Sequence, residues 1–249
     1  MVSALKVQAC PLPTAILSVH TGFSTYHIDD YTEKMRPYID NWRKNKLEFD
    51  GILTGFFGSR RQIKIVSQFI AEFRSNHTLV TVDPVMGDHG RLYSSYTPAM
   101  GEEMRILLHK ADLLLPNLTE ACYLLGTPYP AGGKINRDAL CDMGRALQDK
   151  GPRQVVITGL EEGTTLTNAI FDGDAEPNFC QVGKIGGDRS GTGDAFAAIV
   201  SACMLKGETL SAAVQKATDF ISRALRYAEN LNLPWNYGLP FEEFLTELR

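Results

Sequence analysis

The clearest chemical signal in the sequence is a glycine-rich stretch that ends in an acid, Gly186-Gly187-Asp188-Arg189-Ser190-Gly191-Thr192-Gly193-Asp194. Glycine has no Cβ, so this backbone can turn tightly and direct several N–H groups at one point. The apolar run at 195–200 predicts a buried helix whose N-terminal N–H groups and dipole would add to the same anion site. An acid there repels a bound phosphate, which suits a general base that takes a proton from a hydroxyl attacking phosphorus. The alternative is a glycine turn with Asp194 as a helix cap.

Short β-branched runs alternate with longer amphipathic segments, which predicts a parallel sheet covered by helices. We expect strands at residues 51–54, 78–82, 113–115 and 154–158, with two antiparallel strands within 165–182 around a turn at 172–174. Helices are expected from a cap at Ser59 to about residue 73, and at 118–125, 137–149, 192–206 and 210–228. No internal repeat or linker interrupts the chain, so we expect one domain.

Several polar residues fall at or just after the carboxyl ends of these expected strands, namely Thr54, Asp83, Asn117 and Thr158. In open α/β sheets that edge is where ligands bind. Each residue alone also fits a turn or a cap. Their shared position favours a ligand site, although the sequence has neither a P-loop nor a Gly-x-Gly-x-x-Gly motif after a strand.

The composition excludes several classes of protein. A net charge of −4 without a basic stripe argues against nucleic-acid binding. No apolar stretch approaches the length of a membrane span, and the first ten residues lack a secretion signal. The five cysteines are scattered and never paired as Cys-x-x-Cys, which is typical of reduced thiols in a cytoplasmic protein.

Three further segments accompany Gly191-Thr192-Gly193-Asp194 in order: Ser18-Val19-His20-Thr21-Gly22, Asp83-Pro84-Val85-Met86-Gly87-Asp88 and Pro116-Asn117-Leu118-Thr119-Glu120. Together they resemble the ribokinase-like sugar and vitamin kinases, and among these the pyridoxal kinases. The resemblance covers nearly all of residues 7–228. It implies an α/β fold, a ribokinase-like three-layer α/β/α sandwich with a mostly parallel central sheet. Residues 1–5 resemble the end of the family's first helix, so we expect a single kinase domain at 1–249 that lacks the family's first strand and helix.

The same resemblance implies roles for individual residues. Asp194 would be the catalytic base, with an anion hole at Gly191, Thr192 and Gly193. The expected ATP contacts are Asp88, Asn117, Glu120, Thr158 and Gly159. The expected Mg²⁺ ligands, often acting through water, are Asp83, Asn117 and Glu120. The expected substrate contacts are Ser18, Thr21, Phe56, Tyr93 and Asp194. From their spacing alone, Asn117 and Glu120 fit a helix-capping box equally well.

The resemblance therefore implies ATP-dependent phosphorylation of the 5′-hydroxymethyl group of pyridoxal, pyridoxine or pyridoxamine. Mg²⁺ is expected as a cofactor, with a monovalent cation left open, and a cytoplasmic homodimer is expected by the same resemblance. One alternative is a hydroxymethylpyrimidine kinase of thiamine synthesis, which shares the base and the anion hole. Another is an inactive homologue that binds nucleotide or vitamin. Residues of the ring pocket would separate these alternatives.

Overall fold

A computed structural model describes residues 1–248 of the chain. Its central sheet contains β3 (Gly51–Thr54), β4 (Leu79–Val82), β7 (Leu113–Leu114), β8 (Gln154–Glu162), β9 (Thr165–Asp172) and β10 (Asn178–Gly183). The spatial order is β10-β9-β8-β7-β4-β3; the four strands from β3 to β8 are parallel, and β9 and β10 are antiparallel. Two small antiparallel pairs lie outside this sheet, β1 (Ala15–Leu17) with β2 (Ile28–Asp30) and β5 (Gly87–Asp88) with β6 (Arg91–Leu92).

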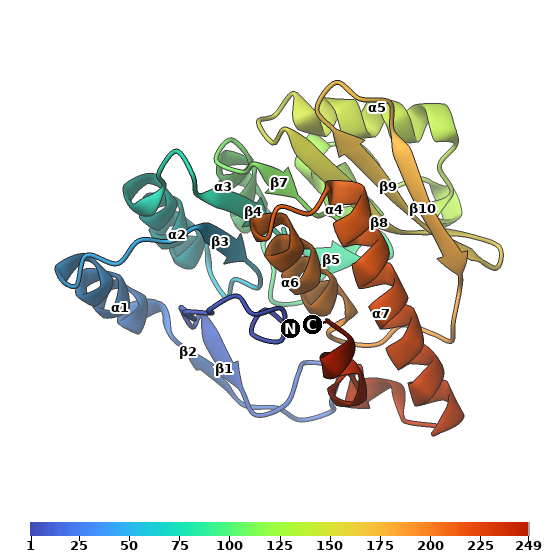
Figure 1. Cartoon of the computed structure of the whole chain (residues 1–249), viewed down its shortest axis with the longest axis horizontal. Coiled ribbons are helices and arrows are strands. Elements are labelled where there is room, and N and C mark those ends of the chain that lie inside the picture. Colours follow the sequence, from blue (N-terminus) through green and yellow to red (C-terminus); the bar gives the residue numbers. More distant parts are fainter. Residues whose placement is uncertain (249) are drawn as a thin grey trace.

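Helices cover both faces of the sheet (Figure 1). Side chains of α1 (Thr32–Lys44), α2 (Arg60–Phe73), α3 (Pro98–Leu108), α4 (Leu118–Leu125) and α5 (Arg137–Gln148) join one hydrophobic core. Those of α6 (Thr192–Leu205) and α7 (Leu210–Asn230) join the core on the other face. Three short 3₁₀ helices complete the described chain, η1 (Ala131–Gly133), η2 (Trp235–Tyr237) and η3 (Glu242–Leu248).

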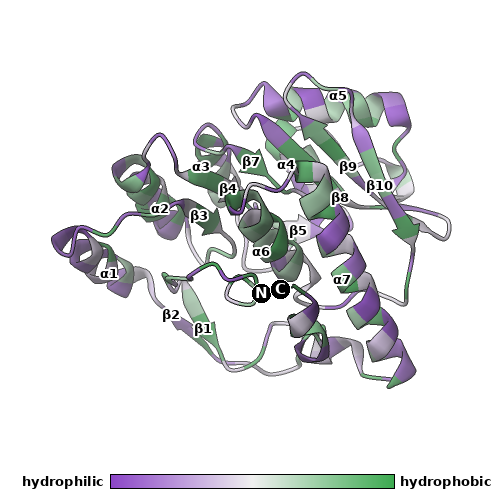
Figure 2. Ribbon diagram, in the orientation of Figure 1, coloured by the Kyte–Doolittle hydropathy of each residue, from purple (hydrophilic) through white to green (hydrophobic). Residues whose placement is uncertain are grey.

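The strands are apolar on both faces, as a parallel sheet between two helical layers requires. Val155 and Ile157 of β8 belong to the core shared with α2 to α5, whereas Val156 between them packs with α6 and α7. All three side chains are fully buried. In Figure 2 the strands of the central sheet are mostly hydrophobic, whereas the helices that flank them also carry many hydrophilic residues. The result is the expected three-layer α/β/α sandwich.

The expected strands and helices at and after residue 51 are present, with ends within a few residues of the prediction. The largest difference is β8, which continues to Glu162 because β9 pairs with it beyond a register shift between Ile157 and Leu160. We did not predict α1 or α3. In α1, Met35, Ile39 and Trp42 recur at helical spacing, but Pro37 lies inside the helix, where proline is unfavourable.

Strand β3 lies at one side of the central sheet. β4 is the only partner of β3 among residues 1–248, so β3 is an edge strand. The expectation of a further family strand stays a prediction.

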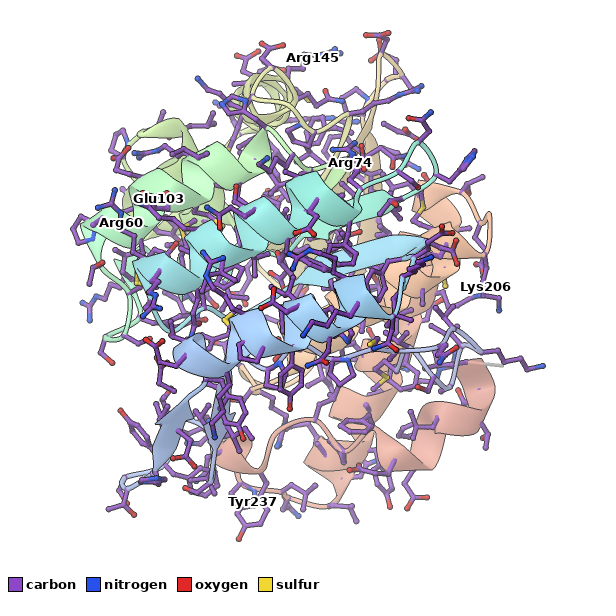
Figure 3. All side chains as sticks on the ribbon, turned by 90° about the vertical axis from the view of Figure 1, so that its left-hand side faces the viewer. Arg60, Arg74, Glu103, Arg145, Lys206 and Tyr237 are labelled. Atoms are coloured by element: carbon purple, nitrogen blue, oxygen red, sulfur yellow. The ribbon has the colours of Figure 1, made fainter. Side chains whose placement is uncertain are left out.

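The helices α2 and α3 are joined on their outer side by an ion pair between Arg60 and Glu103, whose side-chain atoms lie 2.6 Å apart (Figure 3). Within the described chain, every helix is too short or too polar to cross a membrane.

A test of this packing replaces Gly144, a buried residue of α5, by alanine. An added Cβ would lie 2.2 Å from the buried ring of Phe171 in β9. Although alanine favours a helix by about 1 kcal/mol over glycine, overpacking should lower the free energy of unfolding by about 1–3 kcal/mol. Urea denaturation measures this change.

Gly101→Ala in α3 is the matched control, because a Cβ there meets no other atom within 4 Å. It should raise the free energy of unfolding by about 0.5–1 kcal/mol. Equal effects of the two substitutions would contradict the packing of α5 on β9.

Candidate active site

The expected site residues gather at one edge of the sheet, where the parallel strands end. Thr54 is the last residue of β3, Asp83 follows β4, and Thr158 lies where β8 becomes irregular. An isolated backbone bridge between Asn117 and Thr158 joins the start of α4 to this edge. Strand ends, and not proximity in the sequence, therefore bring these residues together.

The glycine-rich loop enters α6 through Gly191, the N-cap residue, at φ +86°, a backbone conformation that favours glycine. The backbone N–H groups of Gly191, Thr192, Gly193 and Asp194 have no acceptor among residues 1–248. The Thr192 hydroxyl donates to the carbonyl of Arg189 at 3.1 Å, which fixes the turn. Free N–H groups at the positive end of a helix dipole can bind an anion.

Asp194 lies in the first turn of α6, beside these N–H groups. Its side chain is accessible to solvent. Partial desolvation by the surrounding protein raises the pKa of its carboxyl group. A raised pKa makes the ionised carboxylate a better proton acceptor near neutral pH. The geometry thus places a proton acceptor directly beside a set of anion-binding donors.

Asp83 is a buried carboxyl without a hydrogen-bond partner among the described residues, and only 8% of its surface is exposed. Its pKa is raised well above the usual value, first by burial and then by the negative charges of Glu120 and Asp194. An unpaired buried charge is costly unless a proton or a cation compensates it. Asp83 is therefore ready to accept either.

Glu120 and Asn117 form a complete capping box at the start of α4. The Glu120 carboxyl accepts from the backbone N–H groups of Asn117 at 2.9 Å and Met86 at 3.0 Å. The Asn117 amide accepts from the Glu120 N–H at 3.0 Å and donates to the carbonyl of Gly87 at 2.8 Å. Burial raises the pKa of Glu120 to about 8, although the N–H donors oppose that rise.

These contacts limit how the site could hold Mg²⁺. Asp83 has free oxygen atoms, whereas those of Asn117 and Glu120 already accept hydrogen bonds from the backbone. Within the described residues no three His, Cys, Asp or Glu side chains form a metal-binding cluster. Mg²⁺ commonly keeps several waters and takes only one or two carboxylates from a protein. The donor set fits Mg²⁺ with Asp83 as the direct ligand and Asn117 and Glu120 acting through water.

A tight hairpin of β5 and β6 carries Asp88 and Tyr93 to the same edge. It requires glycine at position 87, because a Cβ there would lie 2.2 Å from the carbonyl oxygen of Arg91. The pKa of the Tyr93 hydroxyl is raised by burial and by the negative charges of Asp88, Glu120, Asp83 and Asp194. The pKa of Asp88 is also raised, mainly by burial.

The hairpin also contacts the glycine-rich loop through His89, whose Nε2 lies 2.7 Å from the carboxyl group of Asp188. This contact raises the pKa of His89. These residues are 99 positions apart and belong to no common motif, so no pattern in the sequence predicts their contact.

The expected nucleotide contacts Thr158 and Gly159 lie beside Asn117. The Thr158 N–H donates to the carbonyl of Pro116 at 2.8 Å. Gly159 has φ +69°, is exposed, and donates its N–H to Asn168 Oδ1 at 3.1 Å. Gly159 is therefore held against Asn168 while its surface stays accessible to solvent.

On the acceptor side, the segment from Ser18 to Gly22 contacts the glycine-rich loop through His20. The Nε2 atom of His20 lies 2.8 Å from the carbonyl of Asn236, which can only accept, so Nε2 carries the proton. The Nδ1 atom accepts from the N–H of Gly22 and lies 3.2 Å from Ser190 Oγ. His20 thus connects this segment to the glycine-rich loop and to residue 236. The Ser18 hydroxyl accepts a hydrogen bond from the backbone N–H of His27 at 2.9 Å, just before β2.

The roles of Thr21 and Phe56 rest on the resemblance alone. Thr21 is exposed and its hydroxyl has no partner among residues 1–248. Phe56 is half-buried after β3, and its carbonyl accepts from the Thr14 hydroxyl at 2.8 Å. No hydrogen bond in the described chain links either residue to Asp194.

Residues 233–238 also contact the site, although no motif in the sequence predicted it. This segment follows α7, and its carbonyl groups meet both His20 and the glycine-rich loop. Its aromatic side chains Trp235 and Tyr237 are exposed, and Figure 3 shows Tyr237 projecting from the surface. The contact joins residues 216 positions apart, so no local pattern could have indicated it.

Comparison with protein families matches residues 2–238 to the family described as phosphomethylpyrimidine kinase. The chain belongs to this family. Within it, the chain is 33% identical to a pyridoxine/pyridoxal/pyridoxamine kinase of Bordetella avium over 70% of this chain and 59% of that protein. It is 26% identical to the thiamine biosynthetic bifunctional enzyme TH1 of Arabidopsis thaliana over 97% of this chain. The match spans 45% of TH1, so both relatives are considerably longer than the part that the chain matches.

A solved structure confirms the fold. A candidate phosphomethylpyrimidine kinase from Bacteroides thetaiotaomicron, crystallised with pyridoxal, superposes with a TM-score of 0.95 and 37% identity, over 99% of this chain and 87% of that one. The expected ribokinase-like sandwich and the resemblance to pyridoxal kinases are therefore confirmed. The relatives divide between vitamin B6 and thiamine names, so the family alone leaves the substrate open.

The raised pKa of Asp83 leads to a prediction about stability and pH. The folded chain keeps this proton where the unfolded chain has lost it, so the free energy of unfolding falls as pH rises above the usual aspartate pKa of about 4. For one proton the limiting slope is about 1.4 kcal/mol per pH unit. Asp83→Asn removes this titration, so in chelator-treated buffer its Tm should exceed the wild-type Tm at about pH 8 by more than at about pH 5.

Glu208→Gln is a control of opposite sign, because a hydrogen bond from Lys216 lowers the pKa of Glu208. This variant should be less stable than wild type at neutral pH, and the difference should shrink as Glu208 becomes protonated in acid. An Asp83→Asn chain that is less stable than wild type from pH 5 to 8 would contradict the assignment.

Proposed function

We propose that this chain is a kinase that transfers the γ-phosphate of ATP to the 5′-hydroxymethyl group of pyridoxal, pyridoxine or pyridoxamine. The observation that carries the proposal is the carboxyl group of Asp194 beside the unpaired N–H groups of Gly191, Thr192 and Gly193. The 37% identity to a protein crystallised with pyridoxal supports the B6 substrate, as does the 33% identity to the Bordetella kinase.

In the proposed reaction, Asp194 accepts the proton of the substrate hydroxyl as its oxygen attacks the γ-phosphorus. The bond from that phosphorus to the bridging oxygen of ADP breaks, and ADP leaves. Catalysis of such a transfer depends mainly on positioning and charge neutralisation. The N–H groups of Gly191 to Gly193 would donate to the phosphoryl oxygens, where charge is held in the transition state.

The negative charges of the carboxyl groups in the site would repel the negative charges of a polyphosphate, so the proposed reaction needs a cation. Mg²⁺, when bound, would neutralise phosphate charge. Asp83 would hold it directly, with Asn117 and Glu120 acting through water. Asp88 and Tyr93 on the hairpin and Thr158 with Gly159 would border the nucleotide phosphates.

Hydroxymethylpyrimidine is the second candidate acceptor. It offers the same reacting group, a hydroxymethyl on an aromatic ring, so the base and the anion hole would act identically. The family description and the match of TH1 to 97% of this chain favour it. The two candidates differ only in the ring that Ser18, Thr21 and Phe56 would contact. The expected homodimer and monovalent cation stay predictions.

The test is ATP-dependent phosphorylation of pyridoxal and of hydroxymethylpyrimidine, measured side by side as ADP release and as the mass of the product. Asp194→Asn should lower kcat about 10²–10⁴-fold, because the general base is lost, while the affinity for ATP stays near the wild-type value. Isothermal titration calorimetry with a non-hydrolysable ATP analogue measures that affinity.

Asp174→Asn is the control, because Asp174 is an exposed residue of the turn after β9, at the opposite edge of the sheet. Its kcat should equal the wild-type value. Turnover of hydroxymethylpyrimidine alone would transfer the proposal to the thiamine substrate. Binding of vitamin and nucleotide without turnover would replace it by the inactive homologue, and an active Asp194→Asn chain would exclude Asp194 as the base.

A further inference from the structure

Arg189 is the one residue of the stretch from Gly186 to Arg189 whose side chain is buried. Gly186, Gly187 and Asp188 are exposed, whereas 5% of the Arg189 side chain is accessible to solvent. A guanidinium group is always charged and is rarely buried unless it is paired. Its partners therefore determine how this loop can lie.

The partners of the guanidinium group all belong to the end of α7 and the segment after it. Nη1 donates to the carbonyl of Pro234 at 3.1 Å, and Nη2 donates to the carbonyl of Leu233 at 2.8 Å. Nη2 also lies 3.4 Å from the carboxyl group of Glu229. Because these groups occupy the buried fork, Arg189 is not available to bind a phosphate in the open site. Its effect on a ligand must be indirect.

The backbone of Arg189 connects this anchor to the N–H donors. Its carbonyl accepts the hydroxyl hydrogen of Thr192, the first residue of α6. The next residue, Ser190, contacts His20, which in turn donates to the carbonyl of Asn236. The loop is thus attached to residues 233–236 at two consecutive positions, directly by the side chain of Arg189 and indirectly through Ser190 and His20.

We propose that Arg189 is a positioning residue that holds the backbone of Gly191, Thr192 and Gly193 in its anion-binding orientation. The inference rests on the proposed function and adds to it a requirement for residues 233–236. Without the guanidinium group, the carbonyl groups of Leu233 and Pro234 lose their donor and the loop loses its attachment to them. The N–H groups then no longer converge, although every group that would touch the substrate is still present.

The experiment compares Arg189→Met with Arg105→Met. Arg105 is a matched control, since it also donates to two consecutive carbonyls, those of Tyr123 and Leu124, and pairs with a glutamate, Glu102. The two carbonyl groups lie at the end of α4 and Glu102 lies in α3, so none of these partners belongs to the glycine-rich loop or to residues 233–236. In Arg189→Met, kcat should fall about 10–100-fold, as expected when anion-hole donors are misplaced, with a smaller change in KM for the acceptor. In Arg105→Met, kcat should stay at the wild-type value.

Arg189→Lys provides the conservative rescue, because an ammonium group can donate to one carbonyl but cannot form the fork. Its kcat should lie between those of wild type and Arg189→Met. If Arg189→Met does not fold, as judged by near-UV circular dichroism, Arg189→Lys and Glu229→Gln take its place and should show the same fall in kcat to a smaller extent. Equal kcat in the Arg189 and Arg105 variants would overturn the inference.

Binding of inorganic phosphate, followed by ³¹P NMR, separates this inference from the kinase proposal. If the wild-type chain has no turnover but binds phosphate, loss of that binding in Arg189→Met and its retention in Arg105→Met would support the positioning role. Equal binding by both variants would overturn it. A wild-type chain that neither turns over nor binds phosphate would also overturn it, because the loop would then not be an anion hole.

Discussion

Two backbone N–H groups from different parts of the chain, those of Met86 and Asn117, donate to the carboxyl group of Glu120. This interaction joins the turn after β4 to the start of α4. Asp83 precedes that turn and Asp88 follows it, so their positions depend on the same contact. If Glu120 did not bind both groups, the hairpin of β5 and β6 would keep only its other bonds to α4, such as the one from Asn117 to the Gly87 carbonyl. The buried carboxyl group of Glu120 therefore holds the turn after β4 against the start of α4.

The electrostatic balance of the site follows from this arrangement. Four carboxyl groups of the site have raised pKa values, those of Asp83, Asp88, Glu120 and Asp194. Each therefore ionises less readily than an ordinary carboxyl group. Close to them lie backbone donors suited to an anion, and the buried cation Arg189 is already committed to carbonyl groups. The backbone N–H groups would thus attract an anionic ligand, whereas the ionised carboxyl groups would repel it. The proposed reaction therefore needs an additional cation.

The sequence predicted the architecture well because parallel strands and amphipathic helices leave strong local patterns. Glu120 and Asn117 illustrate the limit of motif reasoning, since their spacing fitted a metal site and a capping box, and the structure shows the capping box directly. The roles of Asp194 and of the other expected site residues stay predictions, although the fold gathers most of them at one edge. The contacts of His20 and Arg189 with residues 233–236 could not be predicted from the sequence, because they join segments far apart in the chain that share no local pattern.

The two ends of the chain also pack together, since Leu5 and Leu248 share one hydrophobic core and the termini are adjacent in Figure 1. The contact from His20 to Asn236 closes 216 residues, whereas β8 and β9 pair across a short turn. Contacts of such long sequence separation carry the largest cost of loop closure and form late when a chain folds. The sheet can therefore assemble before the glycine-rich loop is held in place. A partly folded chain would retain most of its secondary structure while lacking the one arrangement that could bind a phosphate.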